Sequence, residues 1–209
     1  MKSGFHYKTK AMRTQSPAEI SGRTVETYPF QGDWKQLFDE PDIRFSTLIQ
    51  GEAKSGKSTY AALFAQYCGE NFGRTLYVSA EERLNSKTLQ NRLKICNVTS
   101  TNVRFIHSKS ISEIETVIKN GKFRFVIFDS VQHIQMSYNE FEAMRHRFKK
   151  RKLSWHLIMQ MGVDVTKWKH EVDVLVMVKH GRAYIKGRYN SANSIQVLSN
   201  TNGQQSLNF

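Results

Sequence analysis

Short apolar runs alternate with helix-type segments along most of the chain. The strand-like runs cover residues 45–50, 75–79, 103–107, 124–128 and 155–160. The segments between them, near residues 60–67, 86–95, 112–120 and 140–150, have the character of helices, with apolar residues three and four positions apart in the first. Strands and helices that alternate in this order predict a parallel sheet with helices on both faces.

The pattern changes toward the C-terminal end of the sequence. An apolar run at residues 172–178 is followed by a Lys-His-Gly turn and by further strand-like runs at 182–188 and 194–198. Strand-like runs that turns separate predict consecutive antiparallel strands. We therefore predict an α/β fold with a mainly parallel central sheet, flanking helices, and antiparallel strands at the C-terminal end.

The beginning of the sequence has a weaker pattern. Residues 1–26 are polar and predict an N-terminal arm, either a tail or a contact to another subunit, with a capped helix start at Ser16 to Glu19. Residues 30–38 are rich in aromatics and predict a lid over the sheet edge. Residues 27–209 are predicted to form one core domain, since a domain has about 100 to 200 residues.

Composition narrows the class of protein. No apolar run approaches the roughly 18 residues needed to cross a bilayer, and the polar start lacks the apolar region of a secretory signal. Cys68 and Cys96 are not spaced as a metal-binding pair, and we expect both to be small core residues. Sparse cysteine usage is typical of a reducing compartment, so we expect a cytoplasmic protein with no membrane contact.

Residues 51–59 match the phosphate-binding pattern G-x-x-x-x-G-K-[ST] at every required position. A strand-like run precedes the match and a helix-like segment follows it, so backbone N–H groups and a helix N-terminus can surround a phosphate. A glycine-rich turn without a ligand is the alternative, which the correct flanks disfavour. The predicted phosphate-binding residues are Gly51, Glu52, Ala53, Lys54, Ser55, Gly56, Lys57, Ser58 and Thr59.

These residues predict ATP and Mg²⁺ as ligands. Lys57 is expected to reach the β and γ phosphates, and Ser58 to hold Mg²⁺. Asp129 ends the apolar run 125–128 and is expected to hold the same ion, unless it merely starts a turn. Glu81 and Glu82 follow another strand, and either could accept a proton from the water that attacks ATP.

The charge of the chain is strongly positive. It has 31 Lys and Arg against 18 Asp and Glu, a net charge of +13, which indicates a polyanionic partner. We expect nucleic acid first and an acidic membrane surface second, and an unengaged basic surface is the remaining alternative. The densest cluster contains Arg145, Arg147, Lys149, Lys150, Arg151 and Lys152.

Together these motifs resemble the RecA superfamily of P-loop ATPases, most closely its RadA branch, with the KaiC and DnaB-type helicase cores as cousins. The resemblance covers roughly residues 45–200. It rests on residues 51–59, on 76–82, whose first glutamate would be the catalytic base, and on 126–132, which resembles the Walker B strand. It implies Glu81 as the base and Gln160 as a sensor of the γ-phosphate.

A further match lies at residues 185–190. In RadA-like proteins and hexameric helicases, a Lys-x-Arg pair here reaches the ATP of a neighbouring subunit, so the resemblance implies Lys186 and Arg188 as residues acting in trans. Two outward cations on an edge strand are the alternative. Lys54 departs from the family, which usually has Gly there, and a solvent-facing side chain is the simplest interpretation.

The resemblance also implies two DNA-binding loops. The second loop, about residues 161–169, contains Lys167, Trp168 and Lys169, a combination of cations and an aromatic ring that suits single-stranded DNA. Trp168 could equally be a packing residue. The first loop, around residues 133–139, offers Tyr138 as a stacking residue. The basic residues Arg145, Arg147, Lys149 and Lys150 complete the predicted DNA-binding set.

We therefore expect an oligomeric, ATP-dependent motor, a ring or a filament, that binds DNA in recombination, repair or replication and whose ATPase activity DNA stimulates. Minimal RecA-like cores of this size are typical of phages and mobile elements. A replicative-helicase core or helicase loader is the alternative within the fold. A regulatory or scaffolding ATP-binding protein without DNA activity is the alternative from another class.

Overall fold

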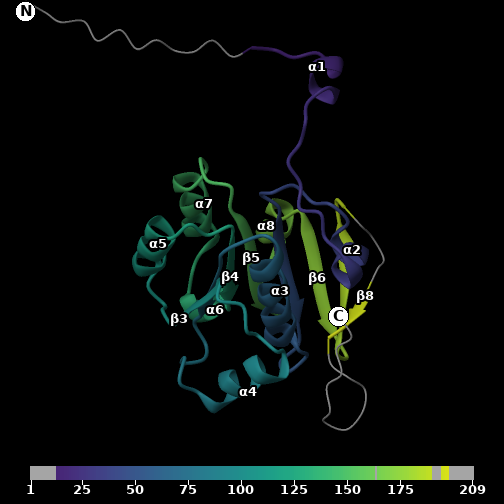
Figure 1. Ribbon diagram of the computed structural model, residues 1–209. Coiled ribbons are helices and arrows are strands. Elements are labelled where there is room, and N and C mark those ends of the chain that lie inside the picture. Colours follow the sequence, from purple (N-terminus) through teal and green to yellow (C-terminus); the bar gives the residue numbers. More distant parts are fainter. Residues whose placement is uncertain (1–12, 163, 190–193, 198–209) are drawn as a thin grey trace, which may run out of the picture.

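The strands of the protein form one sheet with the order β3-β2-β4-β5-β1-β6-β7-β8 (Figure 1). The computed structural model describes residues 13–162, 164–189 and 194–197. The strands are β1 (Ser46–Gly51), β2 (Thr75–Ser79), β3 (Val103–Ile106), β4 (Phe125–Asp129), β5 (Ser154–Gln160), β6 (Val174–Lys179), β7 (Arg182–Gly187) and β8 (Ser194–Gln196). Position 198 of the last predicted strand lies outside the described residues.

The sheet is parallel from β3 to β6 and antiparallel from β6 to β8. β1 is central and every one of its residues is buried, as expected for a parallel strand with helices on both faces. In β6 the buried positions alternate with less buried ones, so this strand is fully covered on one face only. The predicted α/β fold, including its antiparallel end, is confirmed.

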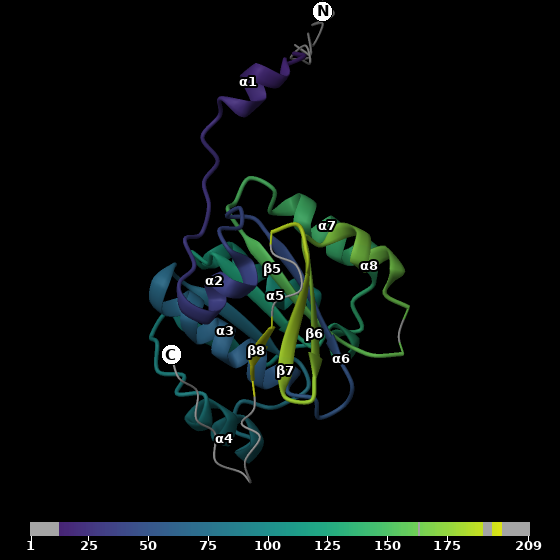
Figure 2. The same cartoon turned by 90° about the vertical axis from the view of Figure 1, so that its right-hand side faces the viewer.

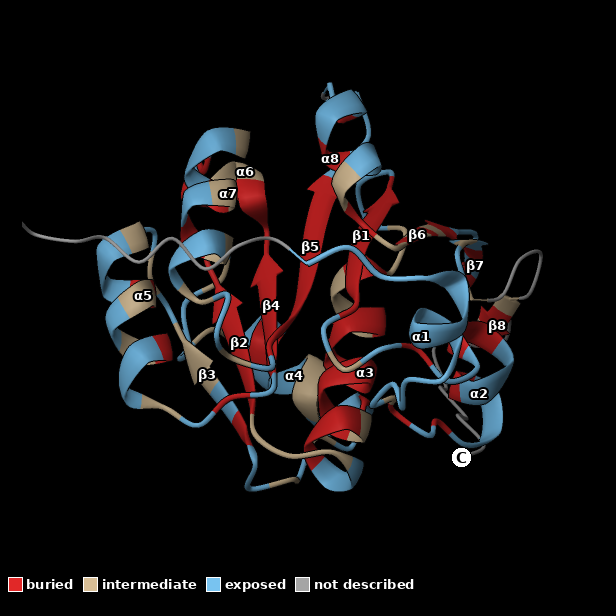
Figure 3. Cartoon of the chain, turned by 90° about the horizontal axis from the view of Figure 1, so that it is seen from above, coloured by how far each residue is buried: buried red, intermediate tan, exposed pale blue. Residues whose placement is uncertain are grey.

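Helices cover both faces of the sheet (Figure 3). One face carries α2 (Gly32–Phe38) and α3 (Lys57–Asn71), with α4 (Lys87–Ile95) packed on α3. The other face carries α5 (Ile111–Asn120), α6 (Val131–Ile134), α7 (Tyr138–Arg147) and α8 (Thr166–Glu171). Each face thus has its own apolar core, and Cys68 and Cys96 are both buried, as expected.

Aromatic rings join α2 to the sheet and α3. Phe30 lies 6.1 Å from Phe64, Trp34 lies 5.2 Å from Phe64, and Phe38 lies 5.4 Å from Phe45, measured between ring centroids. Phe30 lies just before α2 and its ring is stacked, whereas the other two contacts are tilted and edge-to-face; ring contacts of these kinds add to the free energy gained by burial. The predicted lid is therefore α2, which also contacts β8 at the end of the sheet.

The N-terminal arm leaves the body of the protein and carries α1 (Pro17–Ser21) at some distance from it (Figures 1 and 2). The predicted capped start is present, because Ser16 and Glu19 form a capping box. No residue of α1 is buried. The arm meets the body where Lys152 Nζ contacts the Glu26 carboxylate at 2.5 Å. Residues 1–12 of the predicted arm lie outside the described residues.

The expectation that residues 161–169 form a loop is wrong for its second half. Residues from Thr166 onward form α8, and Trp168 is only 6% exposed. Val165, Trp168 and Val172 are all buried, a spacing of three and four that favours a helix packed by one face. This apolar spacing was present in the sequence among the lysines that suggested a loop.

The loop expected around residues 133–139 is also partly helical. It contains the end of α6 and the start of α7, and α7 begins at Tyr138 because Ser137 and Glu140 form a capping box. No helix in the described part of the chain is both long and apolar enough to span a bilayer.

Candidate nucleotide-binding site

A cavity of about 430 Å³ lies at the carboxyl end of the parallel strands, where such sheets bind ligands. It brings together Lys57, Ser58, Glu81, Asp129 and Gln160, which come from separate parts of the sequence. The full lining is Ala53, Lys54, Ser55, Gly56, Lys57, Ser58, Thr59, Glu81, Glu82, Thr88, Arg92, Asp129, Ser130, Ile158 and Gln160.

The loop between β1 and α3 has the shape of a phosphate cradle. Gly56 has φ 103° and Lys54 has φ 62°, both in the left-handed region that favours glycine. The side chain of Lys54 is exposed, as expected. Its left-handed backbone conformation is the physical reason that glycine suits this position in the family that the sequence resembles. A Cβ at Gly51 would collide with the carbonyl oxygen of Val178. Ser55 Oγ is buried and has no hydrogen-bond partner among the described residues, so the loop retains a polar group for a ligand oxygen.

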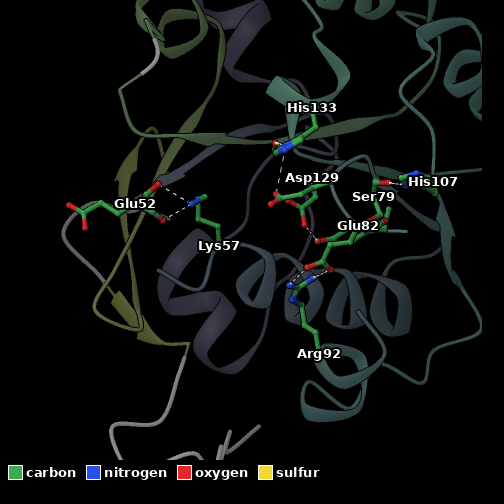
Figure 4. A network of polar contacts seen from close by, with 12 residues as sticks. Glu52, Lys57, Ser79, Glu82, Arg92, His107, Asp129 and His133 are labelled. Carbon is green, nitrogen blue, oxygen red and sulfur yellow. Dashed lines mark hydrogen bonds and ion pairs between the residues drawn. The ribbon is translucent and has the colours of Figure 1, made fainter. Parts of the chain in front are cut away.

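Lys57 is the first residue of α3, and its side chain reaches back to the loop (Figure 4). Its Nζ donates to the carbonyl oxygens of Gly51 at 2.9 Å and Glu52 at 2.7 Å. Burial lowers the pKa of this ammonium group, and the carboxylates of Asp129 and Glu81 act in the opposite direction. The ammonium group is therefore held where a phosphate inside the loop would meet it.

Asp129 lies beside Ser58, the pair predicted to hold Mg²⁺. The Asp129 carboxylate accepts hydrogen bonds from Tyr77 at 2.5 Å and from Ser58. Burial raises the pKa of the Asp129 carboxyl, and these hydrogen bonds offset part of that effect. A hydroxyl and a carboxylate are the oxygen ligands that Mg²⁺ prefers, so the residues present fit the ion.

Glu81 and Glu82 have different surroundings. Glu82 makes a two-point ion pair with Arg92, at 2.7 and 2.9 Å, and both side chains are largely buried. The Glu81 side chain is 50% exposed, and its Oε2 lies 3.7 Å from Nδ1 of His133. Glu82 is therefore committed to Arg92, whereas Glu81 keeps a carboxylate that a water molecule can reach.

Arg92 and His133 were not predicted from the sequence. Arg92 is on α4 and reaches the cavity through its ion pair with Glu82. His133 Nδ1 lies 2.8 Å from Ser130 Oγ, directly after the Walker B strand. The position of His133, four residues after Asp129, was a usable signal, whereas nothing local marked Arg92.

Lys186 and Arg188 lie away from the phosphate-binding loop of the same chain. In the sheet, Lys186 pairs with Leu175, which pairs with Leu48 in β1. Arg188 pairs with Asp173 at 3.0 Å, and the Asp173 carboxylate accepts a hydrogen bond from the N–H of Ser46, the first residue of β1. The Arg188 guanidinium is thus near the amino end of β1, and the phosphate-binding loop follows its carboxyl end. Position 190 of the Lys-x-Arg segment lies outside the described residues.

The predicted DNA-binding residues fall into two groups. Trp168 contacts Phe141 at 5.4 Å and the edge of Tyr138 at 5.7 Å between ring centroids, so the expectation of an exposed stacking tryptophan is wrong. Tyr138 is half-buried in the same contact. The four lysines of the set, Lys149, Lys150, Lys167 and Lys169, are exposed.

The two predicted arginines form ion pairs within the protein. Arg145 pairs with Glu142 at 2.9 Å and with Glu171 at 3.5 Å, and Arg147 pairs with Glu115. Since carboxylates already compensate both guanidinium groups, their charge is less available to a partner than that of the exposed lysines.

The comparisons with known proteins found similarity in three-dimensional structure only. Neither a protein-family profile nor a curated protein sequence matches the chain. The flagellar accessory protein FlaH from Methanocaldococcus jannaschii is 14% identical, with a TM-score of 0.59 over 80% of this chain and 89% of that one. The KaiC-like protein PH0186 from Pyrococcus horikoshii OT3 is also 14% identical. Its TM-score is 0.54, over 77% of this chain and 88% of that one. The chain has a RecA-like P-loop fold.

Proposed function

We propose that this protein is an ATP-hydrolysing RecA-like motor that works as an oligomer on DNA, in recombination, repair or replication. The observation that carries the proposal is the single cavity that gathers Lys57, Ser58, Glu81, Asp129 and Gln160. A phosphate-binding loop by itself would bind a nucleotide without hydrolysing it. The added carboxylates at the ends of β2 and β4 supply the groups that hydrolysis requires.

The phosphates of ATP would lie in the loop between β1 and α3. Lys57 donates to their oxygens in place of the carbonyls of Gly51 and Glu52, and Ser55 Oγ gains a partner. Mg²⁺, when bound, neutralises charge on the β and γ phosphates. Ser58 and Asp129 are the residues that would hold it.

Hydrolysis requires a base, and Glu81 is the carboxylate available for that role. Glu81 accepts a proton from water as the water oxygen attacks the γ-phosphorus. The bond from that phosphorus to the bridging oxygen breaks, and the electron pair leaves with ADP. Lys57 stabilises the negative charge that develops, and Gln160 at the end of β5 is positioned to contact the γ-phosphate.

An oligomer completes the site. Arg188 is near the amino end of β1, away from its own phosphate-binding loop, and its side chain is 71% exposed although it pairs with Asp173. Any nucleotide that it contacts would therefore belong to a neighbouring subunit, and contact would require it to leave Asp173. Lys186 is on β7, two residues before Arg188, and is also exposed. A cation supplied in trans would make hydrolysis depend on assembly, because charge in the transition state is stabilised only when the neighbour is docked.

DNA is proposed as the partner because the net charge of +13 exceeds what solubility requires. Single-stranded DNA is favoured, and Lys149, Lys150, Lys167 and Lys169 are exposed cations that could contact its phosphates.

The test is the rate of phosphate release from ATP and Mg²⁺, with and without a single-stranded oligonucleotide at low salt. We expect turnover that the oligonucleotide raises, and we expect Lys57→Ala to reduce turnover to background. Turnover that is unaffected by the oligonucleotide would favour the regulatory ATP-binding alternative. Absence of Mg²⁺-dependent nucleotide binding in the unmodified protein would refute the whole proposal.

A further inference from the structure

A second cavity lies at the amino end of the sheet, opposite the phosphate-binding loop. It has a volume of about 310 Å³ and lies between the C-terminal end of α7, the start of β5 and the residue before Phe45. We call it the amino-end pocket, and its lining is Arg44, Glu142, Arg145, His146, Phe148, Lys149, Arg151, Leu153 and Trp155. Four of these side chains are cations and one is a carboxylate.

Arg151 is fixed in the wall of the amino-end pocket. Its guanidinium donates to the carbonyl oxygens of Ile118 at 2.6 Å, Lys119 at 2.6 Å and Gly121 at 3.0 Å, at the end of α5. The guanidinium also lies 5.6 Å from the centre of the Phe148 ring. Carbonyl groups orient a guanidinium and carry no net charge, so the positive charge of Arg151 remains in the wall.

Two further cations of the pocket, Arg44 and Lys149, form no ion pair with a carboxylate among the described residues. Lys149 Nζ contacts Nε2 of His146 at 3.0 Å, so one basic group lies against another. Arg44 is exposed and forms no ion pair with any residue in the described ranges, although, after Lys152 and Arg124, its charge also helps to lower the pKa of the nearby Glu26 carboxyl. Only Arg145 is compensated, by Glu142 and Glu171. Arg44, Lys149 and Arg151 therefore leave an excess of positive charge around a hollow.

We propose that the amino-end pocket binds a phosphate group of a single-stranded nucleic acid. This inference rests on the DNA-binding part of the proposed function and locates it. Guanidinium groups donate to a phosphate through two parallel N–H groups, and an ammonium group adds a point charge. A phosphate here would give Arg44 and Lys149 a direct anionic partner, since neither forms an ion pair within the described part of the chain.

A nucleic acid suits the amino-end pocket better than a membrane surface. A membrane-binding site usually combines cations with apolar side chains that enter the bilayer. The exposed large apolar side chains among the described residues are Ile20, Val25, Leu84, Ile95, Met161 and Tyr184. None of them lines the amino-end pocket, and Phe148, Leu153 and Trp155 at its floor are partly or fully buried.

The site is separate from the nucleotide site. α7 is toward the top of Figure 1 and α4, beside the phosphate-binding loop, is toward the bottom, with the length of the sheet between them. Lys167 and Lys169 are on α8, which packs beside α7 through the contact of Trp168 with Phe141. A strand held in the pocket can therefore continue past exposed lysines without contacting the ATP cavity.

The experiment measures binding of a fluorescently labelled single-stranded oligonucleotide to the full chain, by anisotropy over a series of salt concentrations and without ATP. The test variant combines Arg44→Ala with Lys149→Ala. We expect its affinity to fall about tenfold or more, and the slope of log K against log salt to become shallower by about 0.7 for each phosphate that the variant no longer neutralises. Lys149→Arg keeps the charge and is expected to retain binding.

The matched control combines Lys87→Ala with Lys94→Ala on α4, which removes the same charge from exposed positions at the other end of the sheet. We expect its affinity to change little. Arg44 and Lys149 are exposed, so the test variant should unfold at the temperature of the unmodified protein.

Several outcomes would overturn the inference. An equal loss of affinity in both double variants would mean that binding follows total charge, and an unchanged affinity in the test variant would mean that the pocket is not used. Binding to vesicles of phosphatidylcholine with phosphatidylserine that requires Arg44 and Lys149, without oligonucleotide binding, would assign the pocket to a membrane. ATP hydrolysis measured without oligonucleotide checks the motor separately, so the two failures are distinguishable.

Discussion

The two ends of the sheet differ in how their charged side chains are partnered. At the carboxyl end most are held by specific partners: Lys57 by two carbonyls, Asp129 by Tyr77 and Ser58, and Glu82 by Arg92. At the amino end Arg44 and Lys149 are exposed and form no ion pair with a carboxylate among the described residues. ATP hydrolysis requires side chains that are already held in position before the reaction. Binding of a polyanion requires cations that are not already paired with carboxylates of the protein.

The first test concerns Arg188, a cation near the amino end of β1 that is proposed to act on the nucleotide site of a neighbouring subunit. On the proposal that Arg188 stabilises the transition state in trans, Arg188→Ala should lower the turnover number by about 10³-fold or more. Mixing Arg188→Ala protein with Lys57→Ala protein should restore part of the activity, since one supplies an intact loop and the other the guanidinium. Turnover assays on the mixture check this. A mixture as inactive as its components would place Arg188 outside the reaction.

The second test separates the two glutamates at the carboxyl end. Glu81→Gln should lower the turnover number by about 10²- to 10⁴-fold while nucleotide binding persists, because the amide cannot accept a proton from water. Glu82→Gln is the matched control and should cost less, since it weakens only the ion pair with Arg92. Single-turnover hydrolysis and equilibrium binding of a labelled nucleotide measure the two effects. Normal hydrolysis by Glu81→Gln would show that another group is the base.

A third test concerns the amino end and asks whether Trp168 packs or binds. Its ring is 6% exposed, so Trp168→Ala should reduce the free energy of unfolding by about 3 to 5 kcal/mol. Lys167→Ala, at the exposed neighbouring position, should change it by less than about 0.5 kcal/mol. Urea unfolding gives both values. If Trp168→Ala weakens oligonucleotide binding without loss of stability, the ring is a contact residue.

The smallest effect is expected from His156, which lies in the core between the two ends. Burial lowers its pKa from 6.5 to about 3, and its Nδ1 lies 2.9 Å from Thr47 Oγ1. The folded protein keeps His156 neutral, whereas the unfolded chain binds a proton below pH 6.5. Stability is therefore complete above that pH and falls as pH decreases toward 3, by at most about 1.4 kcal/mol per unit from this residue.

Urea unfolding at several values between pH 5 and 7 measures this dependence, in a range above the ordinary pKa of carboxylates. The comparison variant is His156→Asn, which keeps a polar group for Thr47 and cannot be protonated in this range. We expect its stability to depend less on pH over that interval. An identical dependence in both proteins would mean that other groups are responsible.

Much of the fold and of the nucleotide site could be predicted from the sequence. The strands from β1 to β6 lie close to their predicted positions because parallel strands read as short apolar runs, and β7 was marked by the turn before it. Lys57, Ser58 and Asp129 were identified because each belongs to a local motif beside a strand. Trp168 was misjudged because the flanking lysines suggested a loop, although Val165 and Val172 carried a helical spacing.

The sequence by itself determined the elements, the phosphate-binding loop and the excess of positive charge, since these depend on neighbouring residues and on composition. Only the tertiary structure decided that Glu82 is bound to Arg92 while Glu81 stays accessible, and that Arg188 is near the end of β1 that does not carry its own phosphate-binding loop. It also placed Arg44 beside Lys149 and Arg151 in one pocket. Such placements depend on strand order and packing between residues far apart in the sequence, which no local pattern encodes.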